Sequence, residues 1–262
     1  MSALNVLKRR DVIHVVSDGG YYDDDGRVLS FGCKVYPIAH FPGFVGALGR
    51  VLAGPLLAAA LGQAASDIDA LFDKIELLLP EFEDRFEDVL EDGVSGMMVG
   101  GWSAARNEMR LGYIKGRAKS EPDIHTLKIF AGDQAIAWPV ISEARQLDAF
   151  GRLFYSIDDV PAPEDYAKRQ LMAQRHTEFE LPSGRKGCGI GGFGQLTTIT
   201  RDGVGTKIVA RYPDRVGEYM TPEPIDWAAF RAEGTGASTA GLSRLQRDML
   251  ARKQRKAERR AS

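Results

Sequence analysis

Residues 11–38, DVIHVVSDGGYYDDDGRVLSFGCKVYPI, contain two runs rich in apolar and β-branched residues, separated by a polar segment. The first run, 11–18, ends in an aspartate, and the segment YYDDDG that follows it supplies turn residues. The second run, 27–38, shows strand-like alternation of apolar side chains. Because β-branched and aromatic residues favour strands, the stretch predicts a strand, a turn and a second strand.

Two helices are expected after this β-structure. Residues 46–61, GALGRVLAGPLLAAAL, are rich in alanine and leucine on more than one face, which is typical of a helix buried against a sheet. Gly62 is its expected end. A second helix is expected from Ser66, which can cap it together with Asp69, and Pro80 is expected to end it.

The rest of the chain returns to β-structure around one further helix. The segments expected to form strands are 97–102, 107–116, 127–130, 134–140 and a hairpin over 196–212, and the expected helix is 163–176. Strands at both ends around a central pair of helices favour helices layered on antiparallel sheets, an α+β fold. The number of layers is left open by these patterns.

Composition excludes several classes of protein. The chain has 262 residues, a formal net charge of −2 and a pI near 6.1, so it carries no global positive charge for nucleic acid or anionic membrane. Its two cysteines, Cys33 and Cys188, have no CxxC partner or histidine cluster, and we expect no disulfide framework and no metal site. With no signal peptide and no apolar run of about 20 residues, a cytoplasmic protein is expected.

The composition shifts near the C-terminus. We expect a folded domain over 2–226, a flexible linker over 227–241 and a basic helical tail over 242–262. The tail segment from Arg244 to Arg260 permits weak contact with nucleic acid or an acidic partner, although it has no interleaved aromatic residues for base stacking.

Several motifs resemble those of one known family. The segments VVSDGG, DGRVLSFGCKVYPI and VGALGR are similar to the start of proteasome β-type subunits and their simpler bacterial relatives. The later segments LMAQRH and IGGFGQLTTITRDG resemble the last helix, the glycine pair and the following hairpin of that family, with the insertion TEFELPSGRKGCG between them. Together the two matches cover roughly residues 2–115 and 160–212.

The resemblance implies an N-terminal-nucleophile (Ntn) hydrolase with a four-layer αββα fold. In that family a nucleophile at the mature N-terminus is followed after 16 residues by an aspartate and after 16 more by a lysine, and Ser2, Asp18 and Lys34 satisfy both intervals. The family's oxyanion donor, a backbone N–H in a strand-to-helix turn, corresponds to Gly46. The resemblance also implies a homo-oligomer, a peptide or small amide as substrate, and no cofactor.

Each of these residues has a chemical reason to be present. A serine hydroxyl is a poor nucleophile without a base, and a free α-amine with a pKa of about 7.7–8 can act as one, so Ser2 qualifies only after Met1 is removed. Lys34 would favour the deprotonated hydroxyl, and Asp18 would orient and balance the Lys34 charge.

Other interpretations stay open. Proteasomes carry threonine where this chain has Ser2, the family's Gly-Ser-Gly loop is absent, and His176 replaces a supporting aspartate. Asp18 and Lys34 could form a structural ion pair without catalysis. The alternative is a non-catalytic protein of the same fold that binds partners through its tail and its insertion. The run 187–194 contains GxGxxG, but a strand is expected after it, which disfavours a dinucleotide site.

Overall fold

The computed structural model describes residues 2–49, 51–86, 94–115, 126–181 and 183–235. The chain divides into two compact units, Met1–Pro224 and Ile225–Ser262. The first unit contains both large sheets and the helices that pack on them, so the candidate site lies entirely within it.

The first large sheet is antiparallel and carries the N-terminal strand near its centre. Its five strands, in spatial order, are β10 (Gln134–Ile136), β1 (Leu4–Lys8), β2 (Val12–Asp18), β13 (Phe193–Thr200) and β14 (Gly203–Arg211). The Asp202-Gly203 turn joins β13 to β14, which confirms the predicted hairpin. Pairing of β1 with β2 places Leu4 opposite Ser17, so the start of the chain lies beside the end of β2.

The second large sheet is also antiparallel. It contains β5 (Val35–Pro37), β6 (Gly43–Gly49), β7 (Val94–Ser103), β8 (Glu108–Lys115) and β9 (Leu127–Ile129), in that order. Two short hairpins, β3 (Gly20–Tyr22) with β4 (Val28–Phe31) and β11 (Phe179–Glu180) with β12 (Lys186–Gly187), lie outside these sheets. The predicted strand over 27–38 is therefore two strands, β4 and β5, which belong to different sheets.

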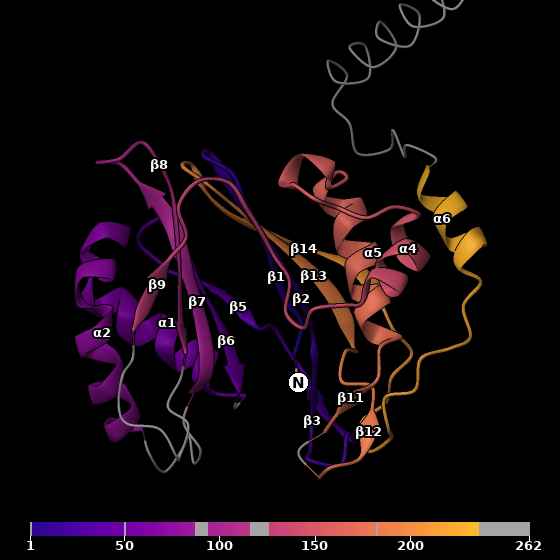
Figure 1. Ribbon diagram of the computed structural model, residues 1–262. Helices are drawn as coiled ribbons and strands as arrows, with labels where there is room; N and C mark the ends of the chain where they lie inside the picture. Colours follow the sequence, from indigo (N-terminus) through magenta and orange to yellow (C-terminus); the bar gives the residue numbers. More distant parts are fainter. Residues whose placement is uncertain (1, 50, 87–93, 116–125, 182, 236–262) are drawn as a thin grey trace, which may run out of the picture. The chain divides into compact units, whose positions relative to one another are not determined.

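Helices cover one face of each large sheet (Figure 1). The described helices of the first unit are α1 (Ala53–Ala64), α2 (Ile68–Arg85), α4 (Glu143–Phe150) and α5 (Pro163–Arg175), with a 3-10 turn η1 (Ile157–Asp159). α1 and α2 pack on the β5–β9 sheet through Leu57, Leu71 and Ile75, and α5 packs on the other sheet through Leu171. These contacts confirm an α+β fold with antiparallel sheets.

A third hydrophobic cluster joins the two large sheets. Leu4, Val6 and Val15 from the first sheet pack with Phe44 and Met98 from the second. Strand side chains alternate between the two faces of a sheet, so each sheet has one apolar face toward helices and one toward the other sheet. Val45 and Phe44 illustrate this, since they belong to the helix-facing cluster and to the cluster between the sheets, respectively.

The helix predicted over 46–61 is wrong in its first part. Residues 46–49 belong to β6, which pairs with β5 on one side and β7 on the other, and the helix begins only at Ala53. Sheet pairing and burial of Phe44 and Val45 outweigh the helical preference of alanine and leucine at the start of this segment.

Both expected helix boundaries at glycine and proline are also wrong. α1 passes through Gly62 and ends at Ala64, and α2 passes through Pro80 and ends at Arg85. The N-cap of α2 is Asp67, whose carboxylate accepts a hydrogen bond from the Ala70 amide, so Ser66 is one residue too early. The apolar face of α2 continues to the buried Phe82, which explains why Pro80 does not stop the helix.

The second unit contributes one described helix, α6 (Trp227–Thr235), where we expected the beginning of a flexible linker. The Asp226 carboxylate accepts hydrogen bonds from the Ala228 and Ala229 amides, and the alanine-rich sequence that follows favours a helix. The expected linker beyond Thr235 and the basic tail lie outside the described residues. Among the described residues, none of the helices is long and apolar enough to cross a membrane.

Candidate active site

Asp18, the last residue of β2, is fully buried and accepts four hydrogen bonds. Its Oδ1 accepts from the Ala3 amide at 2.8 Å and from the Lys34 ammonium at 2.7 Å. Its Oδ2 accepts from the amides of Gly20 at 3.1 Å and Gly191 at 3.2 Å. A buried carboxylate needs such partners, and these four tie the N-terminus, Lys34, β3 and the segment before β13 to one side chain.

Lys34 is buried beside Asp18, immediately before β5, with 2% of its surface exposed. Its ammonium lies 5.2 Å from the centre of the Tyr21 ring, within the range of a cation–π contact. Burial lowers the pKa of Lys34 below its ordinary value, and the Asp18 carboxylate opposes that effect. The structure thus brings Asp18 and Lys34 together as the sequence predicts, and Lys34 gives up its proton more readily than an exposed lysine.

Ser2 is half-buried and directly precedes Ala3, whose amide is held by Asp18. The Ala3 side chain belongs to the helix-facing cluster, and the Leu4 side chain belongs to the cluster between the sheets. Side chains along an extended chain alternate between its two faces, so the Ser2 side chain is expected on the same face as Leu4. That face is directed toward the second large sheet, which contains Val35, the residue after Lys34.

Gly46 lies inside β6, opposite Val35 on one side and Met98 on the other. The expected strand-to-helix turn at this position is therefore wrong, because β6 continues to Gly49. The Ala47 amide donates to the Lys34 carbonyl, so alternation directs the Gly46 N–H toward β7 and away from β5.

The absence of a side chain at Gly46 leaves room for the Leu4 side chain. A β-carbon at this position would lie 3.0 Å from Cδ1 of Leu4 and 3.1 Å from Cδ2. Gly46 therefore lets β1 approach the second sheet two residues after Ser2.

Buried polar atoms lie on the same face of the first sheet as Leu4. Ser17, the residue opposite Leu4, pairs on its other side with Gln195. The Gln195 amide donates to the Thr197 hydroxyl at 3.0 Å. Within the described part of the chain, the Ser17 hydroxyl and the Gln195 carbonyl oxygen have no hydrogen-bond partner.

The sequence did not reveal a second buried ion pair close to Asp18. The Arg175 guanidinium, at the end of α5, donates to both oxygens of the Asp214 carboxylate at 2.9 and 2.8 Å. Asp214 in turn accepts from the Gly192 amide at 2.7 Å. Arg175 and the glycine pair lie in the segments LMAQRH and IGGFGQLTTITRDG, which resemble the family. Asp214 lies in a segment without such a sequence signal.

His176, which was expected in place of a supporting aspartate, contacts two backbone carbonyl oxygens. Its Nδ1 lies 3.0 Å from the Met172 carbonyl oxygen and its Nε2 lies 2.8 Å from the Glu223 carbonyl oxygen. These contacts attach the end of α5 to the segment after β14.

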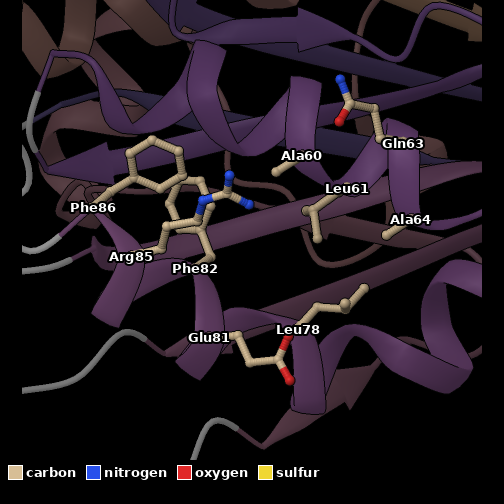
Figure 2. A pocket seen from close by; sticks show the side chains of 9 residues that line it. All are labelled: Ala60, Leu61, Gln63, Ala64, Leu78, Glu81, Phe82, Arg85 and Phe86. Atoms are coloured by element: carbon tan, nitrogen blue, oxygen red, sulfur yellow. The ribbon is translucent and has the colours of Figure 1, made fainter.

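A hollow of about 270 Å³ lies between α1 and α2, and its lining includes none of these residues (Figure 2). Its lining includes Leu61, Leu78 and Phe82, with Glu81 and Arg85 as charged members. Among the described residues, there is no group of three or more His, Cys, Asp or Glu side chains that could hold a metal ion. Asp18 and Lys34 are not among the residues that line this hollow.

Comparisons with models of known protein families and with curated proteins found no match.

Proposed function

We propose that this chain is an Ntn hydrolase related to proteasome subunits, with Ser2 as its nucleophile and a peptide or other amide as its substrate. The observation that carries the proposal is the shared Asp18 carboxylate, which binds the Ala3 amide and the Lys34 ammonium at once. The buried Asp18–Lys34 ion pair is therefore hydrogen-bonded to the residue that follows the proposed nucleophile.

The arrangement of helices and sheets supports the same proposal. α1 and α2 pack on one large sheet, α5 packs on the other, and an apolar cluster joins the sheets, which is compatible with a four-layer αββα fold. The strand that begins at Leu4 lies between β10 and β2, and the Ala3 amide, next to residue 2, donates to the buried Asp18 carboxylate. Fold alone does not assign an activity, so the proposal depends on the site.

The proposed reaction begins once Met1 has been removed. The Ser2 Oγ forms a bond to the carbonyl carbon of the substrate amide, and its proton passes to the free α-amine of Ser2. The resulting ammonium gives that proton to the leaving nitrogen as the C–N bond breaks. The products of this step are a free amine and an ester on Ser2.

Water completes the cycle. Its oxygen bonds to the ester carbon, the bond between that carbon and Oγ breaks, and a proton returns to Oγ, which releases a carboxylic acid. Lys34 would stabilise negative charge that develops on Oγ, and Asp18 would keep the Lys34 ammonium in place. A backbone N–H would receive the oxyanion; the direction of the Gly46 N–H toward β7 does not favour the donor that the resemblance implies.

Three variants test the proposal on a panel of acylated peptide and small amide substrates. Ser2→Ala should abolish turnover and leave the melting temperature unchanged, because the change removes one oxygen at a half-buried chain end. Ser2→Thr should retain turnover, since it keeps the hydroxyl. Turnover that survives Ser2→Ala would exclude Ser2 as the nucleophile.

The third variant, Lys34→Met, distinguishes a catalytic role of the Asp18–Lys34 pair from a purely structural one. Turnover per folded molecule should fall by at least about 100-fold, the lower range for a positioned proton-transfer or charge-stabilising group. Retained turnover in the folded fraction would mean that the pair is structural and would favour the interaction-protein alternative. A homo-oligomer remains a prediction, which sedimentation of the full chain would test.

A further inference from the structure

We propose that the Arg175–Asp214 ion pair is a positioning device for the site, acting through Gly191 and Gly192 on the carboxylate of Asp18. The inference uses the proposed function only to give Asp18 its purpose. The five residues come from four separate parts of the sequence, and hydrogen bonds together with the Gly191–Gly192 peptide bond connect them in one chain.

The backbone of the Gly191–Gly192 turn is held from two sides. The Gly191 amide donates to Asp18 Oδ2, and the Gly191 carbonyl accepts from the Gly19 amide at 3.2 Å. The Gly192 amide donates to Asp214 Oδ2, and the Gly192 carbonyl accepts from the Tyr212 amide at 2.9 Å. All four polar backbone groups of the turn are therefore satisfied, two of them by carboxylates.

The ion pair is well suited to fix this turn. The side chain of Arg175 is 0% exposed and that of Asp214 is 2% exposed, and the two-point contact between them restricts rotation of both groups. Arg175 also donates to the Ile190 carbonyl at 3.0 Å, directly before the turn. The guanidinium thus contacts the residue before the turn, while its partner carboxylate contacts the second residue of the turn.

The turn has no spare room. Gly192 has a φ of +73°, in the left-handed region that favours glycine. A β-carbon on Gly191 would lie 2.4 Å from Asp214 Oδ2 and 3.2 Å from Arg175 Nη1. Because the glycines touch the ion pair directly, a displaced Asp214 displaces the amide that Asp18 accepts.

Through Asp18 the effect reaches the N-terminus. The same carboxylate that accepts from Gly191 through Oδ2 accepts from Ala3 through Oδ1. Rotation of the carboxylate lengthens both bonds together. Arg175 and Asp214 are therefore assigned as positioning residues.

Asp214→Asn tests the inference, with amide hydrogen exchange by NMR as the readout. The variant keeps the shape of the side chain but loses its charge and one acceptor, so exchange at Ala3 and Gly191 should become at least about tenfold faster than in the wild type. Val99, a fully buried residue of β7, lies in the other sheet between β6 and β8, and its amide serves as the internal reference for global unfolding.

Asp165→Asn is the matched control. It removes an aspartate that accepts from Arg169 Nε at 2.9 Å on the same helix, α5, and contacts neither glycine. Its exchange at Ala3 and Gly191, relative to Val99, should match the wild type. Equal exchange ratios in Asp214→Asn and Asp165→Asn would overturn the inference.

A second variant covers the case in which Asp214→Asn does not fold. Arg175→Lys keeps the positive charge but cannot make the two-point contact, so it should accelerate exchange at Ala3 and Gly191 to a smaller degree. Unchanged exchange in this variant would also overturn the inference.

The rate of electrophile addition at Ser2 separates the inference from the proposed function. Where the wild type forms the adduct, the Asp214→Asn rate should fall at least about tenfold while the Asp165→Asn rate stays at the wild-type value. A wild type that forms no adduct contradicts the proposed function, and the exchange ratios then still decide the inference.

Discussion

The Lys34 ammonium lies 2.7 Å from Asp18 Oδ1, with the two side chains 1% and 0% exposed. A pair this deeply buried costs free energy to desolvate, and it is retained only when further hydrogen bonds satisfy its atoms. Asp18 meets that condition through three backbone amides, one of which belongs to Ala3.

Removing one member of this pair should destabilise the fold strongly. Lys34→Met leaves the Asp18 charge buried without a cation, and we expect a loss of about 3–5 kcal/mol in the free energy of unfolding, measured by urea denaturation. The double variant Asp18→Asn/Lys34→Met should be more stable than Lys34→Met alone, because no charge is then left unpaired. Effects of the single variants that simply add would contradict direct coupling.

An exposed ion pair provides the comparison. Arg201 and Asp202 lie 3.4 Å apart with side chains 71% and 81% exposed. Water screens such a pair, and Asp202→Asn should change the free energy of unfolding by less than about 0.5 kcal/mol. A loss in the free energy of unfolding as large as that of Lys34→Met would show that burial does not determine how much an ion pair contributes to stability.

Gly46→Ala should destabilise the chain by about 1–3 kcal/mol, because the new methyl group would press on the buried Leu4 side chain. Gly205→Ala is the control, since a β-carbon at that strand position meets nothing within 4 Å. It should be neutral or stabilising by about 0.5 kcal/mol. Thermal denaturation of both variants measures the difference, and equal melting temperatures would contradict the close approach of β1 to β6.

The sequence predicted the fold best where local pattern and tertiary pairing agree. β2, the β13–β14 hairpin and α5 follow directly from β-branched runs, an Asp-Gly turn and helical spacing. Residues 46–49 were missed because their partners, β5 and β7, come from distant segments. Likewise, the interval from Asp18 to Lys34 was readable from spacing, whereas the role of Asp214 depends on contacts across the fold that spacing does not encode.

His14 should make stability fall in mild acid. Burial, reinforced by Arg9 and opposed by Asp11, lowers the pKa of His14 below its ordinary value of 6.5. As the pH falls below 6.5, His14 binds a proton in the unfolded chain before it does so in the folded chain. The free energy of unfolding therefore decreases between pH 6.5 and the lowered pKa of the folded state. His14→Asn should remove this part of the pH dependence, as measured by urea denaturation from pH 8 to pH 4; an identical pH profile would contradict it.

Pro80→Ala should stabilise α2. Pro80 lies inside the helix and has no N–H for the carbonyl four residues earlier, that of Glu76. Restoring the N–H and removing the ring from that turn should raise the free energy of unfolding by about 1–3 kcal/mol. A lower melting temperature in Pro80→Ala would mean that packing of the ring outweighs the missing hydrogen bond.

The most direct test of the central claim is the intact mass of the purified chain before and after treatment with an electrophile that captures an N-terminal amine together with its adjacent hydroxyl. We expect a chain without Met1 that gains one adduct, located on Ser2 by fragmentation and absent from Ser2→Ala. A chain that retains Met1, or a free Ser2 that gains no adduct, would contradict the assignment of Ser2 as the nucleophile.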